Sequence, residues 1–130
     1  MSPQKKQSAA REIQSVVIDG NLELAEALAA LNAAAQAATA ALPDALMKCE
    51  TDEEMQTVII QRDTCLLAYL SCMKKTLAHT GPYFESLAKD LEATSKKVKA
   101  DAASLQTAHD AVTLLTKLTS LVGSLVLAFV

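Results

Sequence analysis

Apolar residues recur every three or four positions, without interruption, through the first third of the chain. The positions concerned are Ile13, Val17, Gly20, Leu24, Leu28, Leu31, Ala35, Ala38 and Leu42. Residues at this spacing lie on one face of an α-helix, because the helix completes a turn about every 3.6 residues. The 130 residues include only three Gly and three Pro, which is too few turn-forming residues for a β-sandwich or a barrel. The sequence therefore predicts an all-α protein built from a few long helices.

The first predicted helix begins close to the N-terminus, where Pro3 suits the first helical position. It is expected to end at Pro43, because the residue before a proline is disfavoured in the α conformation. Residues 43–50 then form a connector, with a helical turn as the alternative for this stretch. Gly20 falls on the apolar face, and we interpret it as a point of close packing within one continuous helix. The alternative is a break at residues 19–21.

Two further helices are indicated by signals at their ends. Thr51 followed by Glu54 is a capping box, in which each side chain accepts a hydrogen bond from the other residue's backbone N–H. Gly81 and Pro82 mark the end of this second helix and the beginning of a third, which is expected to run to the C-terminus. Three long helices joined by short connections predict an elongated antiparallel bundle, with residues 1–130 as a single domain.

The second predicted helix has an apolar face of its own. This face comprises Met55, Val58, Ile59, Arg62, Leu66, Tyr69, Met73 and Leu77. Four sulfur-containing residues of the helix are interpreted as core residues, namely Met55, Cys65, Cys72 and Met73. Cys65 and Cys72 are separated by about 10 Å along a helix axis, which is too far for a disulfide. With Cys49 the chain has three cysteines, and an odd number gives no disulfide framework.

Two segments far apart in the sequence contain no charged residue, namely residues 27–43 and residues 118–130. In an up-down-up bundle the C-terminal ends of the first and third helices lie together, so these segments would converge on one tip. We name this predicted feature the apolar head and assign to it residues 27–47 and 111–130. Ten residues are expected to form a membrane or oligomer interface there: Leu31, Leu42, Leu118, Leu121, Val122, Gly123, Leu125, Val126, Leu127 and Phe129.

A monomeric protein in water rarely leaves so large an apolar surface open. The head would be covered by the connector, by a bend at Gly123, by other copies of the chain or by a membrane. The alternative is that residues 118–130 are an ordinary core helix packed on the Ala-rich face of the first helix. These thirteen residues are too short to span a hydrocarbon layer of about 30 Å.

The sequence offers no residue pattern for catalysis, and we expect neither enzymatic activity nor a cofactor. The net charge is −3 with dispersed basic residues, which argues against nucleic acid as a partner. His79 and His109 are the only histidines, and no His/Cys group has the spacing of a zinc site. His109 lies on the predicted apolar face, where it is expected to meet Glu53 or Glu54 in a polar layer of the bundle.

Long antiparallel amphipathic helices, an apolar head and no active-site residues resemble the α-helical pore-forming toxins. The chain is similar in size to the small component of the tripartite cytolysins of Gram-negative bacteria. The resemblance implies a bacterial protein that hides its head in solution by forming a homo-oligomer and exposes it at a lipid membrane, with larger helical proteins as partners. In those toxins the membrane-going segment is commonly a mid-chain hairpin, whereas here it is one helix end together with the C-terminus.

The N-terminal residues MSPQKKQSAAREIQ contain no apolar segment of the kind found in secretory signal peptides. We therefore expect a soluble form without a classical signal peptide, which is secreted by another route and acts at a target membrane. The alternative function is a helical adaptor, chaperone or immunity-type module whose apolar end binds a partner protein. Both functions require an exposed apolar end.

Overall fold

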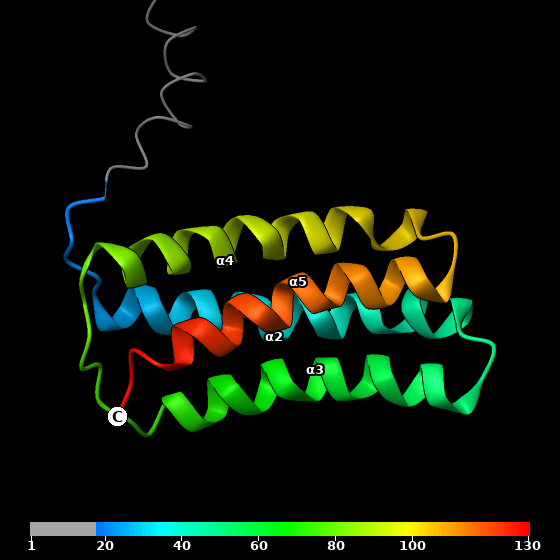
Figure 1. Cartoon of the computed structure of the whole chain (residues 1–130), viewed down its shortest axis with the longest axis horizontal. Helices are drawn as coiled ribbons and strands as arrows, with labels where there is room; N and C mark the ends of the chain where they lie inside the picture. Colours follow the sequence, from blue (N-terminus) through cyan, green and yellow to red (C-terminus); the bar gives the residue numbers. More distant parts are fainter. Residues whose placement is uncertain (1–17) are drawn as a thin grey trace, which may run out of the picture.

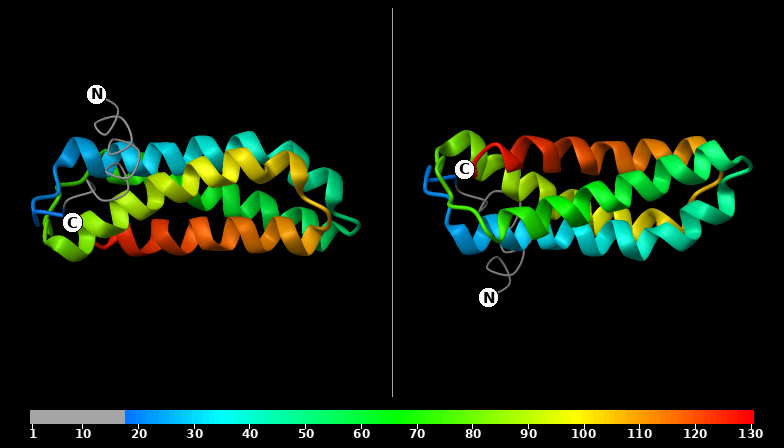
Figure 2. Two further views of the ribbon diagram at one scale, coloured as in Figure 1. Left: turned by 90° about the horizontal axis from the view of Figure 1, so that it is seen from above. Right: turned by 90° about the horizontal axis from the view of Figure 1, so that it is seen from below.

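The computed structural model describes residues 18–130, and in this range the chain forms four α-helices (Figure 1). They are α2 (Leu24–Lys48), α3 (Asp52–Cys72), α4 (Pro82–Asp101) and α5 (Ala108–Val126), with a short 3-10 helix, η1 (Ala102–Ser104), before α5. Helix accounts for 78% of the described residues, which confirms the all-α prediction. The predicted count of three helices is wrong, because the described helices run up, down, up and down along an elongated bundle (Figure 2).

The first described helix begins well after the start that the apolar spacing indicated. Gly20 has a φ of 79°, a left-handed conformation that residues other than glycine rarely adopt and that interrupts a helix. Its N–H donates to the buried carboxylate of Glu85 at 2.7 Å. The prediction of a continuous helix through Gly20 is therefore wrong, and the alternative break at residues 19–21 is confirmed. The part of that prediction within residues 1–17 lies outside the described residues.

At its other end, α2 continues through Pro43 to Lys48, so the predicted helix end at Pro43 and the connector 43–50 are wrong. A proline inside a helix costs about 3 kcal/mol, because one backbone hydrogen bond is lost and the ring crowds the preceding turn. Ala41 and Ala45 on either side are buried in the core, and only a continuing helix keeps both of them there. Tertiary packing therefore offsets the local cost at Pro43.

The predicted third helix is in fact two helices. The Thr107 hydroxyl accepts a hydrogen bond from the Asp110 N–H at 3.1 Å, and the Asp110 carboxylate accepts one from the Gln106 N–H at 3.2 Å. These bonds cap the beginning of α5 after η1 has turned the chain, so that α5 runs antiparallel to α4 (Figure 1). Apolar spacing alone predicts one helix here, because the stripe continues on both sides of the turn.

The beginnings of two helices agree with the sequence. The Glu54 N–H donates to the Thr51 hydroxyl at 3.1 Å, and the Thr51 N–H donates to the Glu54 carboxylate at 3.3 Å. The predicted capping box at the beginning of α3 is thus confirmed, as is the beginning of α4 at Pro82. The predicted end of the second helix at Gly81 is wrong, because α3 ends at Cys72 and residues 73–81 form the connection to α4.

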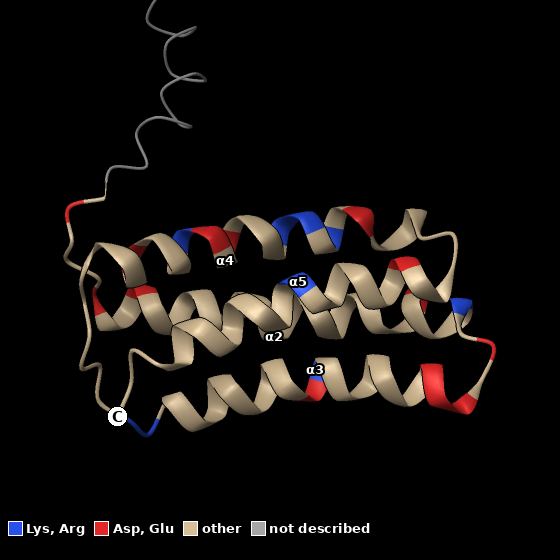
Figure 3. Ribbon diagram, in the orientation of Figure 1, with Lys and Arg blue, Asp and Glu red and all other residues tan. Residues whose placement is uncertain are grey.

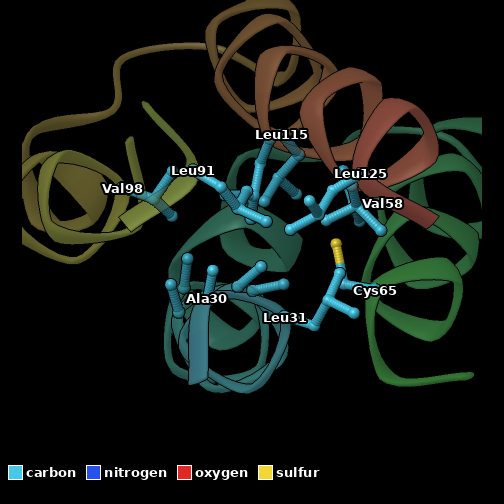
Figure 4. Close-up of a cluster of buried hydrophobic side chains, with 14 of the residues drawn as sticks. Ala30, Leu31, Val58, Cys65, Leu91, Val98, Leu115 and Leu125 are labelled. Carbon is cyan, nitrogen blue, oxygen red and sulfur yellow. The ribbon is translucent and has the colours of Figure 1, made fainter. Parts of the chain in front are cut away.

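The core is organised around α2, which packs against α3, α4 and, across the bundle, α5. Its buried face is mainly alanine: Ala27, Ala30, Ala34, Ala35, Ala37, Ala38, Ala41 and Ala45, with Leu31 among them. Such small side chains let three helices approach α2 closely. Leu91 of α4 and Leu115 and Leu125 of α5 fill the interior left between the helices (Figure 4).

The chain terminus closes one end of this bundle. Val130 and Thr76 exchange two backbone hydrogen bonds of 3.1 Å and 2.9 Å. On the other side of the same connection, the Leu22 N–H donates to the Thr80 carbonyl at 3.1 Å. The connection between α3 and α4 is therefore held between the C-terminus and the segment that precedes α2.

Candidate interaction surface

The predicted apolar head does not form at one tip. Because α5 is antiparallel to α2, residues 118–130 end beside the beginning of α2, at the opposite end from residues 42–47 (Figure 1). The alternative interpretation, that residues 118–130 belong to the core, describes this arrangement. In the described part of the chain, no helix combines the length and apolar character needed to cross a membrane.

The ten residues expected at the head differ in how deeply they are buried. Five are buried in the core: Leu31, Leu118, Val122, Leu125 and Phe129. Three pack against the core with partial burial: Leu42, Leu121 and Val126. Gly123 and Leu127 are exposed. Contact of any of these residues with lipid or with another chain stays a prediction.

The largest departure from the sequence analysis is in α3, where 21 residues include only three buried ones, Val58, Cys65 and Cys72. These three are spaced by seven residues and face the interior, which confirms the two cysteines as core residues. Met55 and Met73 were expected there too, but both are exposed, Met73 by 53%. The apolar face inferred for this helix is therefore directed largely away from the core.

We name the apolar surface of α3 that points away from the bundle the α3 outer face. It comprises the exposed residues Met55, Ile60, Leu66, Leu67, Leu70 and the cap residue Met73, together with Ile59, which is half-buried. At 100° per residue, Met55, Ile59, Leu66 and Leu70 fall within about 60° of one another, and Ile60 and Leu67 form a second row beside them. Ile60 and Leu67 are 60% and 63% exposed. Large side chains thus cover the face over the whole length of the helix.

Charged residues are placed along α3 in a regular order (Figure 3). Its first turn carries Asp52, Glu53 and Glu54, and Lys74 and Lys75 follow its last residue. Near the middle, Arg62 Nε lies 2.7 Å from an Asp63 carboxylate oxygen, with side chains 25% and 47% exposed. The face therefore has an acidic beginning, a basic end and a balanced pair at its centre.

A smaller group of exposed apolar side chains lies at the bundle end that contains the C-terminus. Leu24, Met73, Tyr83, Leu127 and Val130 are all more than 40% exposed, with Leu127 and Val130 near 70%. Leu24 and Tyr83 lie in the first turns of α2 and α4, Met73 follows α3, and Leu127 and Val130 follow α5 at this end of the bundle (Figure 2). Leu127 and Val130 belong to the range assigned to the predicted head, whereas Leu24, Met73 and Tyr83 do not.

The three cysteines lie in apolar surroundings and are free. Burial raises the pKa of the Cys65 thiol to about 11. Burial also raises the pKa values of Cys49, next to the negative charge of Glu54, and of Cys72, where Lys75 acts in the opposite direction. Because the thiolate is the reactive form, these thiols are poor nucleophiles and poor metal ligands.

Neither histidine lies in a cluster suited to catalysis. His79 stacks on Phe84 with ring centroids 5.7 Å apart. His109 is exposed and is not part of the apolar face, which corrects the expectation from its spacing. It lines a shallow hollow together with Glu54. The Glu54 carboxylate already accepts hydrogen bonds from the Glu50 and Thr51 N–H groups. Across residues 18–130, no three His, Cys, Asp or Glu residues gather in a way that could hold a metal ion.

Comparison of the chain with protein-family models, with curated proteins and with solved structures gives no match.

Proposed function

We propose that the chain is a non-catalytic helical interaction module that binds an α-helix of another protein chain along the α3 outer face. The observation that carries this proposal is the row of large apolar side chains exposed along the whole of α3. A contiguous apolar surface of this kind is typical of a site of protein contact rather than of a surface that stays exposed to solvent. The proposal keeps the adaptor-type function that the sequence suggested and moves its contact surface from the predicted head to α3.

The shape of the surface supports a helix as the partner. From Met55 to Leu70 the principal row follows steps of four, seven and four residues, which is the anchor pattern of one helix packed along another. Over this stretch the row is about 23 Å long at 1.5 Å per residue. A straight, narrow surface of these dimensions matches the apolar side of four to five helical turns.

The charges at the two ends of α3 favour one orientation of that partner. A helix running antiparallel to α3 places its N-terminal turn beside Lys74 and Lys75 and its C-terminal turn beside Asp52, Glu53 and Glu54. Carboxylates at the beginning of the partner helix and lysines at its end would complement both regions. The same arrangement also suits the partner's own helix dipole.

A pair of synthetic helices tests this proposal. One fluorescent peptide carries a Leu/Ile row with Glu in its first turn and Lys in its last; the control peptide has the two charged turns exchanged. With the peptide at nanomolar concentration and the protein titrated through the micromolar range at low salt, we expect the first peptide to bind more tightly by fluorescence anisotropy, and Leu67→Glu to weaken it at least about tenfold. Ala93→Glu, at an exposed position of α4, is the matched control and should change nothing. Equal binding of both peptides, or binding that ignores Leu67→Glu, contradicts the proposal.

A second candidate function is contact with a lipid membrane through the apolar bundle end, as a component of a pore-forming toxin. It is favoured by the exposure of Leu127 and Val130, next to Tyr83 and Leu24, at that end. Liposome flotation of the wild-type chain and of Leu127→Glu tests it. We expect the wild type to float with liposomes and Leu127→Glu to remain in the dense fraction, while Leu67→Glu floats normally. Absence of flotation by the wild-type chain excludes this function for the bundle end.

A further inference from the structure

Resting on the proposed function above, we propose that the partner of the α3 outer face is a second copy of this chain. The two copies pack α3 against α3 in antiparallel orientation, about a two-fold axis that passes beside Arg62 and Asp63. In such a symmetric interface the same surface serves both partners and must therefore complement itself. Two features of α3 meet this requirement, the order of its apolar residues and the charges at its ends, and the ion pair at its centre is compatible with it.

The first feature is the order of the apolar residues. In an antiparallel pair, two positions lie opposite each other when they are equally far from the axis. Met55 and Leu70 share a midpoint between residues 62 and 63, and Ile59 and Leu66 share the same midpoint. The principal row of the outer face is thus symmetric about one point, so every large apolar residue in it meets another in the second copy.

An ion pair lies at that midpoint. Arg62 and Asp63 lie on either side of the apolar row, and their side chains are 25% and 47% exposed. A two-fold axis perpendicular to both helices keeps each residue on its own side of the row, so Arg62 lies beside Arg62 of the second copy and Asp63 beside Asp63. Each Arg62 keeps its own Asp63 at 2.7 Å, so the charges at the centre of the interface sum to zero and the pair is compatible with self-pairing.

The second feature is the charge at the two ends. The same midpoint relates Glu50 to Lys75 and Thr51 to Lys74. The acidic beginning of α3, with Asp52 and Glu53, therefore lies beside the basic end of α3 in the second copy, and two-fold symmetry repeats the contact. Parallel pairing would place acidic residues beside acidic residues and lysines beside lysines, and their repulsion would weaken the dimer.

The other described helices have no comparable surface. The exposed side of α4 is rich in charge, with Lys89, Asp90, Glu92, Lys96 and Lys97 along it (Figure 3). Between the two ends of α2, the exposed residues are small or polar. Seven large side chains from each copy reach the low end of the range for specific interfaces, about 1,200 Å² in total, so we expect a dimer with a dissociation constant on the order of ten micromolar.

Cysteine cross-linking of the full chain tests the orientation. Ile59→Cys combined with Leu66→Cys should give a covalent dimer under mild oxidation, because each new thiol faces the other position in the second copy. The two positions are about 10 Å apart within one helix, so they cannot bridge internally, and the native thiols are buried. Ile59→Cys alone should remain monomeric. Efficient cross-linking of Ile59→Cys alone would indicate a parallel pair and overturn the proposal, and so would a double variant that gives no more covalent dimer than Ile59→Cys alone.

Charge exchange at the axis provides a second test that does not depend on how well one variant folds. Arg62→Glu and Asp63→Lys should each raise the dissociation constant of the homodimer at least about tenfold by sedimentation. Mixed together, they should form a heterodimer, because each acidic pair then faces a basic pair. Recovery on mixing shows that both variants are folded; no recovery, with both variants folded by circular dichroism, contradicts the proposal.

The two proposals fail in different ways. If the wild-type chain is monomeric at several hundred micromolar but the charge-matched peptide binds the α3 outer face, self-pairing is wrong and the helix-binding function stands. If the chain is monomeric and the peptide does not bind, both are wrong. If the chain dimerises but Leu67→Glu and both axis variants leave the dimer intact, the interface lies elsewhere and self-pairing through α3 is overturned, while peptide binding still decides the helix-binding function.

Discussion

Replacement of Leu125 separates a core residue from an interface residue. Leu125 is fully buried among residues of α2 and α3 and lies next to Val58 (Figure 4), whereas Leu127, two positions later, is 69% exposed. Truncation of a fully buried leucine to alanine costs about 2–5 kcal/mol, from lost apolar burial and from the cavity that remains. We therefore expect Leu125→Ala to lower the free energy of unfolding by about 3 kcal/mol and Leu127→Ala by less than about 0.5 kcal/mol.

Leu125→Glu should be more damaging, because it also leaves an unpaired carboxylate in an apolar interior. The total free energy of unfolding of a domain is about 5–15 kcal/mol, so this variant is expected to lose most of that stability and with it the cooperative unfolding transition. Thermal melting by circular dichroism, with sedimentation on the same samples, measures both effects. For Leu125→Ala the melting temperature should fall by about 10–15 °C.

One outcome for Leu125→Glu would contradict its place in the core. If Leu125→Glu melts within about 2 °C of the wild type, a shift that corresponds to less than about 1 kcal/mol, and changes only the oligomeric state, then Leu125 is not in the core. That outcome would reject the packing of α5 on α2 and restore residues 118–130 as an intermolecular surface.

Three further predictions concern local features of the bundle. Gly20→Ala should destabilise by about 1 kcal/mol in urea unfolding, because φ is 79° and a Cβ would lie 3.3 Å from Pro82 Cγ; a neutral result would mean that the segment before α2 is not held as described. Thr51→Ala should also cost about 1 kcal/mol through loss of the cap, and Glu54→Ala should add to this cost in the double variant, since the Glu54 carboxylate accepts separate hydrogen bonds from the Glu50 and Thr51 N–H groups. The pKa of Cys65 is raised from 9.0 to about 11, so above pH 9 the unfolded chain loses this proton before the folded chain does. The free energy of unfolding should therefore fall from pH 9 to 11, more steeply in the wild type than in Cys65→Ala. A thiol reagent at pH 8 should modify Cys65 only after unfolding.

Much of the secondary structure could be predicted from residues close in sequence. Apolar spacing of three and four with few Gly and Pro indicates helices whatever their neighbours, because a helix makes its backbone hydrogen bonds within itself. The capping box at Thr51 and the beginning of α4 at Pro82 are likewise local. The turn before α5 carries a local signal as well, Thr107 followed by Asp110, although continuous apolar spacing on both sides conceals it.

What only the tertiary structure decided is which face of each helix is buried and which end lies beside which. α3 is apolar on more than one side, so its periodicity is equally compatible with two inner faces. The Ala-rich side of α2 selects among them, because small Val58, Cys65 and Cys72 allow close approach where larger residues would not fit. Tertiary packing also explains why α2 continues beyond Pro43, since burial of Ala41 and Ala45 outweighs the missing hydrogen bond. A single turn at residues 102–107 then reverses α5, buries the segment expected at the head and leaves the large side chains of α3 exposed. Burial depends on contacts between residues distant in sequence, and a pattern read along one helix contains no information about the surface that it will meet.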